Sequence, residues 1–352
     1  MILIFNIGSA SLRWGLFDEK LNKLSGENLE YPDFSKLKEL TQEILKETDE
    51  KKRPPKAGFI IGHRVVHGGI EFRELTEITN KVLTKLEALS ELAPLHNPPG
   101  LEVIKTCRKE LPDVPNIACF DTSFFANLPD YAKYYALPLG LAEKYKILRY
   151  GFHGISHEYV ASEAAKKLEK PLKELQLITC HLGAGASICA IEDGKPIDTS
   201  MGFTPLEGLM MATRSGNIDP AIILFLEKKG MGPKEIEETL NKKSGLLGVS
   251  GVSGDIRDIL KVIKDENLKE QTKKTRAGLA LQMYAYQIKK YIGAYAVALG
   301  GLDALVFTGA VAEGSELVQG MITHGLSEVL GNFKVLTIPA NEEFAIAQKI
   351  AP

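Results

Sequence analysis

Two short stretches, NIGSAS at residues 6–11 and HLGAGAS at residues 181–187, decide the fold that we expect for this chain. Each contains a glycine-bearing turn between two short apolar runs. Short apolar runs that are bounded by turn residues predict β-strands. The sequence therefore predicts the same strand–turn–strand unit twice, once at the start of the chain and once near its middle.

The two stretches align position by position, and so do the residues that follow them. The aligned pairs are Asn6 and His181, Gly8 and Gly183, Ser11 and Ala186, and Asp18 and Asp193. A unit that repeats in this way predicts a duplicated domain.

Hydrophobic periodicity predicts the other elements of an α/β chain. Helices are expected at residues 35–52, 79–92, 100–109, 220–229, 232–242, 255–265, 268–299 and 316–330. Further strands are expected at residues 58–66, 116–121, 304–308 and 332–338. A proline-rich turn is expected at residues 94–99. Strands therefore precede helices in both halves.

The composition is that of a globular protein with more than one hydrophobic core. The chain has 352 residues, 44% of them hydrophobic and 25% charged, and this length favours two domains. The net charge of −2 argues against a protein that binds nucleic acid or a membrane surface. The longest apolar stretch, residues 291–311, contains glycines and Asp303, so no membrane span is expected.

The four cysteines and the N-terminal residues indicate a cytoplasmic protein. None of the cysteines forms a CxxC pair, and we expect them to be buried and reduced. The first residues, MILIFNIGS, lack the basic segment and the cleavage site of a signal peptide.

The repeated turns have two interpretations. Successive backbone N–H groups in such a turn form a concavity that binds an anion, and glycine leaves room for it. Two such turns could hold the phosphates of a nucleotide. Alternatively, both are ordinary hairpin turns in which glycine supplies a positive φ. The common phosphate motifs GxxxxGK[ST] and GxGxxG are absent from the sequence.

Eight segments, HLGAGAS among them, combine polar and apolar residues in a way that resembles the acetate kinase family. This family belongs to the larger group of sugar kinases, Hsp70-type and actin-type ATPases. The eight segments are GHRVVHGG (62–69), APLHNPPG (93–100), FDTSFF (120–125), RYGFHGISH (149–157), HLGAGAS (181–187), MGFTPLEGLMMATRSGNIDP (201–220), SGVSGDIRD (250–258) and FTGAVAEG (307–314). The resemblance extends in order from Asn6 to Glu343.

This resemblance implies an α/β fold of two duplicated ribonuclease-H-like domains, each with a mixed sheet flanked by helices, and a cleft between them. The implied N-terminal domain, on the acyl and phosphate side, comprises residues 1–124 and 343–352. Residues 125–342 would form the domain that binds the nucleotide and dimerises. The chain is also shorter than is usual for the family, with the loss expected between Asp18 and Gly58 and after Glu343.

The function implied by the resemblance is reversible, Mg²⁺-dependent, in-line transfer of a phosphoryl group from ATP to acetate, which gives acetyl phosphate and ADP. Mn²⁺ would be able to substitute for Mg²⁺, and the protein would be a homodimer. Alternatives within the family are a propionate or butyrate kinase and a pyrophosphate-dependent acetate kinase. Two alternatives from other classes are a catalytically weak regulatory module with an ATPase fold, and a zinc hydrolase that uses the histidine pairs His63/His67 and His153/His157.

Transfer to a carboxylate brings two anions together, so the protein must supply positive charge. Arginine provides planar, bidentate donors for phosphate or carboxylate. By resemblance, Arg64 binds the substrate and Arg214 stabilises the transition state. Asp121 is implied as an essential catalytic carboxylate and His153 as a group that stabilises the transferring phosphoryl group. Structural ion pairs and hydrogen bonds are the alternative roles for all four residues.

The resemblance also assigns substrate, metal and nucleotide sites. The acyl pocket would be lined by Val66, Leu95, Phe152 and Pro205, with His96 beside the acid. Mg²⁺ would be held by Asn6 and Glu342. The nucleotide would contact Ser9, Ser11, Arg13, His181, Leu182, Gly183, Ala184, Gly185, Asp255, Ile256, Arg257, Gly309, Ala310, Val311, Ala312, Glu313 and Gly314.

The chain departs from the family pattern at the nucleotide site. Ala310 and Ala312 stand where glycines are usual, Gly314 replaces an asparagine, and Ala184 replaces another asparagine. Each added methyl group obstructs a close approach of the backbone. These departures leave the identity of the phosphoryl donor open.

Overall fold

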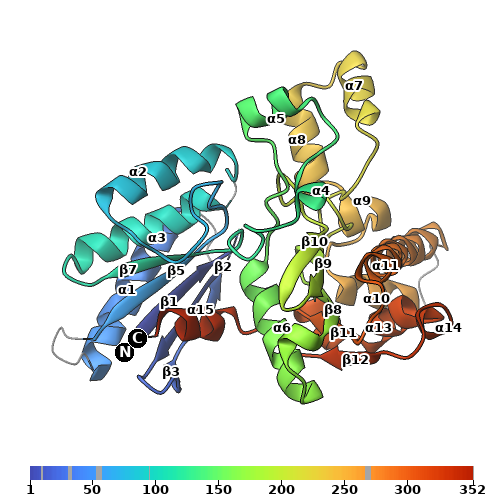
Figure 1. Cartoon of the computed structure of the whole chain (residues 1–352). Coiled ribbons are helices and arrows are strands. Elements are labelled where there is room, and N and C mark those ends of the chain that lie inside the picture. The colour runs from blue at the N-terminus through green and yellow to red at the C-terminus, as the bar shows by residue number, and fades with distance from the viewer. Residues whose placement is uncertain (9–10, 31–33, 53–57, 95, 266–270, 352) are drawn as a thin grey trace. The chain divides into compact units, whose positions relative to one another are not determined.

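The computed structural model describes residues 1–352 except residues 9–10, 31–33, 53–57, 95, 266–270 and 352 (Figure 1). The chain forms two compact units. Unit 1 comprises Met1–Ala126, Phe152–Tyr159 and Asn341–Pro352, and unit 2 comprises Asn127–Gly151 and Val160–Ala340. The segment Phe152–Tyr159, which the sequence analysis places in the second domain, thus packs with unit 1.

Unit 1 is built on a mixed sheet with the strand order β3-β2-β1-β5-β7-β6, and β4 also pairs with β2. Strand β1 is antiparallel to β2 and parallel to β5, and β5 is parallel to β7. The bounds are β1 Ile2–Ile7, β2 Ser11–Phe17, β3 Lys23–Ser25, β4 Asn28–Glu30, β5 Ile60–Val65, β6 Thr76–Glu77 and β7 Asn116–Phe120.

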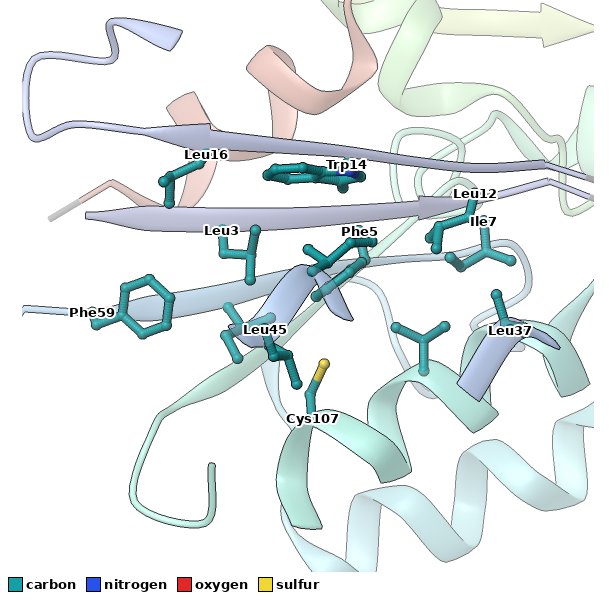
Figure 2. Packing of buried hydrophobic residues seen from close by; sticks show 13 residues of the cluster. Leu3, Phe5, Ile7, Leu12, Trp14, Leu16, Leu37, Leu45, Phe59 and Cys107 are labelled. Atoms are coloured by element: carbon teal, nitrogen blue, oxygen red, sulfur yellow. The ribbon is translucent and has the colours of Figure 1, made fainter. Parts of the chain in front are cut away.

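Helices cover both faces of this sheet because β1 is apolar on both sides. Figure 1 shows α1 (Phe34–Lys52), α2 (Asn80–Ala88) and α3 (Asn97–Glu110) on one side and α15 (Glu342–Ile350) on the other. Leu3, Phe5 and Ile7 point toward α1 and α3, as Figure 2 shows. Ile2 and Ile4 pack with α15 instead. Alternate strand residues face opposite sides of a sheet, so a continuous apolar run is what a strand covered on both faces requires.

Unit 2 repeats the strand order of unit 1. Its sheet has the order β10-β9-β8-β11-β12, with β8 antiparallel to β9 and parallel to β11, and β11 parallel to β12. The bounds are β8 Gln176–Leu182, β9 Ala186–Glu192, β10 Lys195–Thr199, β11 Ala304–Thr308 and β12 Lys334–Thr337. Strands β8, β9 and β11 thus take the places of β1, β2 and β5, which agrees with the predicted duplication.

The helices of unit 2 are grouped around α11 (Gln271–Leu299), which packs on β8 and β9. Its buried face includes Tyr284, Ile288 and Ile292. The other helices are α4 Asp130–Lys133, α5 Leu139–Tyr145, α6 Gly154–Leu168, α7 Ala221–Lys228, α8 Pro233–Lys242, α9 Gly245–Ser250, α10 Ile256–Lys264, α12 Ala310–Gly314, α13 Glu316–Thr323 and α14 Leu326–Leu330. Helix α6 begins with residues of unit 1.

Two predicted boundaries need correction. The proline-rich turn expected at residues 94–99 ends earlier, because α3 already begins at Asn97 with prolines in its first turn. Proline is tolerated there, since the first N–H groups of a helix have no partner within the helix. The helix expected at residues 316–330 is two helices, α13 and α14, separated at Gly325, where φ is +73°.

Candidate functional site

The polar residues of unit 1 gather at the carboxyl ends of three neighbouring parallel strands. Asn6 lies near the end of β1, Arg64 near the end of β5, and Asp121 directly after β7. Open α/β sheets bind their ligands at this edge. The sheet therefore brings together three predicted site residues that are far apart in the sequence.

Arg64 is held by two of its neighbours. Its Nε lies 3.1 Å and its Nη2 2.6 Å from Oδ2 of Asp121. Its Nη1 donates to Oδ1 of Asn6 at 2.9 Å. A guanidinium has five N–H donors, so Asp121 and Asn6 fix its plane and leave donors for an anionic ligand.

Burial and charge act in opposite directions on the Arg64–Asp121 pair. The side chain of Asp121 is 0% exposed and that of Arg64 12% exposed. Burial raises the pKa of Asp121, while the adjacent Arg64 guanidinium lowers it. Burial lowers the pKa of Arg64, but the carboxylates of Asp121 and Glu342 outweigh it, so that the net shift is upward. Arg64 is therefore a permanent positive charge at this edge.

Two glutamates complete the cluster from the first turn of α15. The Nδ2 of Asn6 donates to Oε2 of Glu342 at 2.7 Å and to Oε1 of Glu343 at 2.6 Å. Oε2 of Glu342 also lies 3.7 Å from Nη1 of Arg64. Helix α15 packs on β1, β2 and β5, which places its N-terminus beside the strand ends. With Asp121, three carboxylates thus surround one guanidinium.

The loop before α6 lies against Asp121. His153 has a positive φ of 58°, which is uncommon for a residue other than glycine, and its backbone N–H is bonded to the Asp121 carboxylate. The backbone N of Gly154 donates to the Asp121 carbonyl at 3.0 Å. A Cβ on Gly154 would lie 2.1 Å from that carbonyl oxygen. Glycine is therefore required here for a close approach.

The predicted acyl-pocket residues of unit 1 are buried near one another. Phe152 contacts His67 edge-on, with 5.4 Å between the ring centroids, and Val66 precedes His67. The side chain of Asn97 bonds the backbone of His67 in both directions, at 3.1 Å each, and His96 caps the same helix, α3. Leu95 lies outside the described residues, as does Ser9 of the first turn.

The described glycines of the two turns do not have a positive φ. Gly8 donates to the carbonyl of Ser11 at 2.7 Å, and Gly183 donates to that of Gly185 at 2.9 Å. Neither Gly8, Gly183 nor Gly185 is among the described glycines with a positive φ. The alternative that glycine is present only for a left-handed backbone is therefore wrong for these three residues. Ser11 and Arg13 follow on β2, with Arg13 exposed.

In unit 2, the segments expected to bind the nucleotide meet at the ends of β8 and β11. His181 is paired with Thr308, and Leu182 opens the turn that contains Ala184. Gly309 has φ +87°, and a Cβ there would lie 2.7 Å from the Leu182 carbonyl oxygen. The backbone N of Ala212 donates to the Ala184 carbonyl at 3.1 Å.

Residues 310–314, which are expected to contact the nucleotide, form a short helix, α12, with Gly309 directly before it. Alanine has the highest helix propensity, so Ala310 and Ala312 favour this conformation. Oε1 of Glu313 accepts hydrogen bonds from the backbone N of Gly309 at 2.8 Å and of Ala340 at 2.9 Å. Glu313 thus fixes the segment that also contains Val311 and Gly314.

Two of the predicted residues at the start of α10, Asp255 and Arg257, interact with each other. Asp255 caps this helix and forms an ion pair with Arg257, with 2.5 Å between Oδ2 and Nη2. Ile256 is buried. A Cβ on the preceding Gly254 would lie 2.9 Å from the Ala212 carbonyl oxygen, so the start of α10 lies beside Ala212.

Arg214 and Pro205 belong to one loop of unit 2. Nη1 of Arg214 lies 3.4 Å from the Pro205 carbonyl oxygen and 3.7 Å from Sδ of Met211. Burial lowers the pKa of Arg214. A desolvated guanidinium interacts more strongly with an anion than an exposed one does.

Sequence reasoning missed Glu343 and Glu207. Glu343 follows the assigned Glu342 directly, so its proximity to the cluster could have been inferred. Glu207 bonds Tyr135 and Arg149, and the only signal was its place in the segment MGFTPLEG.

Two features of the described part of the chain bear on the alternatives. No group of three or more His, Cys, Asp or Glu is arranged there to hold a metal ion. His63 instead bonds Oδ1 of Asn116 at 2.7 Å, so the zinc alternative has no support. No helix among these residues is long and apolar enough to cross a membrane. All four cysteines are buried, as expected.

Known proteins resemble this chain over almost its whole length. The acetate kinase of Caldicellulosiruptor saccharolyticus is 44% identical over 99% of this chain and 98% of that protein. That alignment spans 398 positions, more than the 352 residues of this chain. The relative therefore contains segments that have no counterpart here, which confirms that this chain is short for the group.

Solved structures also resemble this chain over almost its whole length. The crystal structure of Porphyromonas gingivalis acetate kinase superposes with a TM-score of 0.84 at 37% identity, and covers 99% of this chain and 98% of that one. A propionate kinase from Francisella tularensis superposes with a TM-score of 0.86 at 34% identity and the same coverage. The sequence profile of the Acetokinase family matches residues 25–332. The chain belongs to the acetokinase family.

Proposed function

We propose that this protein is an acetate kinase, which transfers a phosphoryl group directly and reversibly between ATP and acetate. The observation that carries the proposal is the buried Arg64–Asp121 pair at the carboxyl ends of the parallel strands of unit 1. Family membership supports the same reaction. The acetate kinases of Caldicellulosiruptor saccharolyticus and Porphyromonas gingivalis are similar to the chain over nearly its full length.

Each residue of the cluster has a role that follows from its contacts. Arg64 retains N–H donors beyond those used by Asp121 and Asn6, and these bind the substrate carboxylate or the transferring phosphoryl group. Acetate is already ionised at neutral pH, so the reaction needs no general base. We therefore assign to Asp121 the orientation of Arg64 rather than a proton transfer. His153 and Arg214 stabilise the phosphoryl group by donating hydrogen bonds and positive charge.

We propose Mg²⁺ as the cofactor, and the donor set of unit 1 fits it. Magnesium takes one or two carboxylates together with substrate phosphates, and it requires no cluster of three protein side chains. Glu342 and Glu343 would hold it, with Oδ1 of Asn6 available if the amide turns over. Three carboxylates against one guanidinium leave an excess of negative charge, which a divalent cation neutralises. Held by these residues, Mg²⁺ would supply positive charge to a phosphate group.

The nucleotide is proposed to bind in unit 2, at the ends of β8 and β11. Support comes from the meeting of the turn 181–185, helix α12 and the start of α10 around Ala184 and Ala212. Pyrophosphate is retained as a second donor because Ala310 and Ala312 of α12 stand where glycines are usual in the family. Propionate is retained as a second acceptor because a propionate kinase is among the similar structures.

A homodimer in the cytoplasm completes the proposal. Exposed apolar side chains of unit 2 support self-association, because large apolar side chains rarely face water together without a partner. They include Tyr131, Leu139, Tyr145, Leu224 and Phe225. The substrates are small molecules, and the net charge of −2 offers no general attraction for nucleic acid.

The test is acyl phosphate formation, trapped as the hydroxamate, with a panel of ATP, GTP and pyrophosphate against acetate, propionate and butyrate. We expect ATP with acetate to be the best pair and EDTA to abolish the reaction. Arg64→Ala and Arg214→Ala should each lose several orders of magnitude in kcat, whereas the exposed Arg73→Ala should not. Activity within tenfold of wild type in either variant would contradict the assigned roles.

A further inference from the structure

A partly buried polar network in unit 2 surrounds Glu207, a residue to which the proposed reaction assigns no role. Nη2 of Arg149 donates to Oε1 of Glu207 at 2.9 Å, and the hydroxyl of Tyr135 donates to the other carboxylate oxygen. The side chains of Arg149 and Glu207 are 18% and 28% exposed. Charge-assisted hydrogen bonds of this kind are the stronger ones in proteins.

The same network binds the backbone of the segment that leads to Pro205. The Tyr135 hydroxyl accepts a hydrogen bond from the backbone N of Phe203 at 2.7 Å. Nη1 of Arg149 donates to the carbonyls of Thr199 at 3.1 Å and Met201 at 3.4 Å. Pro205 therefore lies between Phe203 and Glu207, two residues that are both tied to Tyr135.

Gly202 leaves the space that the Glu207 carboxylate occupies. A Cβ at this position would lie 1.6 Å from Oε2 of Glu207 and 2.0 Å from the Tyr135 hydroxyl oxygen. The carbonyl of Gly202 accepts a hydrogen bond from the backbone N of Tyr150 at 3.0 Å. Residue 202 must therefore lack a Cβ to leave room for the Glu207 carboxylate. A glutamate that extended into solvent would not impose this requirement.

Beyond Glu207 the loop continues to Arg214 through a second set of bonds. Gly208 and Asn217 are bonded in both directions, at 2.8 Å through the Asn217 side chain and at 2.9 Å through its backbone N. The side chain of Arg214 contacts the start of the loop, since its Nη1 lies 3.4 Å from the Pro205 carbonyl oxygen. A displacement of residues 203–207 would therefore move Pro205, whose carbonyl oxygen is a neighbour of the Arg214 guanidinium.

We propose that Glu207, fixed by Arg149 and Tyr135, is a positioning residue that holds Pro205 and Arg214 in the geometry needed for phosphoryl transfer to a short carboxylate. The inference rests on the proposed function, in which Pro205 limits the acyl group and Arg214 stabilises the transferring phosphoryl group. Glu207 itself does not need to touch the substrate. It acts by restricting the conformations of the loop. Small displacements of groups that position a substrate lower the rate of catalysis substantially.

The test uses Glu207→Gln, which keeps the shape and removes the charge, and Tyr135→Phe, which removes the hydroxyl that bonds both Glu207 and Phe203. We expect each to raise the KM for acetate about tenfold, the effect of losing one hydrogen bond to a charged group. The ratio of kcat/KM for propionate to that for acetate should change several-fold. The double variant should be less than additive, because both residues act on one loop.

Two controls and one measurement without turnover separate positioning from stability. The controls are Glu192→Gln and Tyr131→Phe, at exposed positions of unit 2, and neither should change KM or the acyl ratio. Hydrogen–deuterium exchange of the full-length wild type and variants should show faster exchange at residues 202–216 in Glu207→Gln and in Tyr135→Phe, and not in the two controls.

A lower Tm with unchanged KM, acyl ratio and exchange would show that Glu207 is only structural and would overturn the inference. A wild-type protein that forms no acyl phosphate would instead contradict the proposed function. The exchange measurement would in that case still decide whether Glu207 orders the loop.

Discussion

A single arginine explains why the carboxyl edge of unit 1 can act on anions. Arg64 is nearly buried, yet two carboxylates keep its pKa above the ordinary value. Burying an ion pair costs desolvation energy, and removing one partner leaves a buried charge without compensation. Asp121 therefore makes it possible for a guanidinium to remain at a site from which water is largely excluded.

One neighbour of Arg64 should determine part of the acid sensitivity of the protein. His63 is 2% exposed, stacks on Phe5 and has its pKa lowered by burial to about 4. Below pH 6.5 the unfolded chain binds a proton that the folded protein does not bind until pH falls to about 4. The free energy of unfolding should therefore fall by about 3 kcal/mol over this range.

Urea denaturation between pH 7 and pH 4 measures this effect. In His63→Gln we expect the part of the pH dependence that is due to His63 to disappear, while the dependence due to carboxylates remains. His324→Gln, at an exposed position of unit 2, is the control and should follow the wild type. If the curves of wild type and His63→Gln keep a constant separation, His63 is not the group responsible.

At the scale of elements, the sequence predicted the helices and strands that have a clear hydrophobic period. It missed several helices that depend on packing within the fold. The helix expected at residues 35–52 is α1, and the strands of both repeats lie where the apolar runs placed them. Helices α4, α5, α6 and α9 were not predicted; α4, α5 and α9 are short, but α6 has 15 residues. Helix α12 was not predicted either, although Ala310 and Ala312 favour a helix.

The candidate site was predictable to the extent that strand ends indicate it. Arg64 and Asp121 follow buried strands, and parallel strands place such residues side by side. The hydrogen bonds of Asn6 to both Glu342 and Glu343 depend on the packing of α15 against β1, which no local pattern encodes. The network of Tyr135, Arg149 and Glu207 likewise joins residues that have no common sequence period.

The junction between β7 and α6 should tolerate very little change. In Gly154→Ala the added methyl group would lie 2.1 Å from the Asp121 carbonyl oxygen. The backbone must then move, and the hydrogen bond from Gly154 to that carbonyl weakens. Because Asp121 orients Arg64, we expect kcat to fall by roughly tenfold to a hundredfold and Tm to fall by a few degrees.

Gly278→Ala is the matched control for this substitution. Gly278 lies within α11, and a Cβ there would meet no atom within 4 Å. Alanine at this position should leave kcat unchanged and raise stability slightly, because alanine favours a helix more than glycine does. Equal kinetic effects of the two substitutions would contradict a specific role for Gly154.

At the scale of the whole molecule, the chain uses one strand arrangement twice for two purposes. In unit 1 the strand ends present Arg64, Asp121 and Asn6, whereas in unit 2 the equivalent ends present the turn that follows His181 and the segment at Gly309. Asn6 and His181 occupy equivalent positions near the ends of β1 and β8. The two units thus share a strand arrangement but carry different side chains at this position. The cleft expected between the two domains stays a prediction.

The last prediction concerns assembly. Tyr131, Leu139, Tyr145, Leu224 and Phe225 of unit 2 are between 56% and 85% exposed, and covering such side chains in a homodimer would remove their apolar surface from water. We expect light scattering to give twice the chain mass of 38.6 kDa for the wild type and a smaller mass for the double variant Leu224→Asp/Phe225→Asp. Val329→Asp alters an apolar side chain of α14 that is 81% exposed and should remain dimeric, because that residue lies outside these segments. A wild type with the mass of one chain, or a double variant that remains dimeric, would show that α7 does not form the interface.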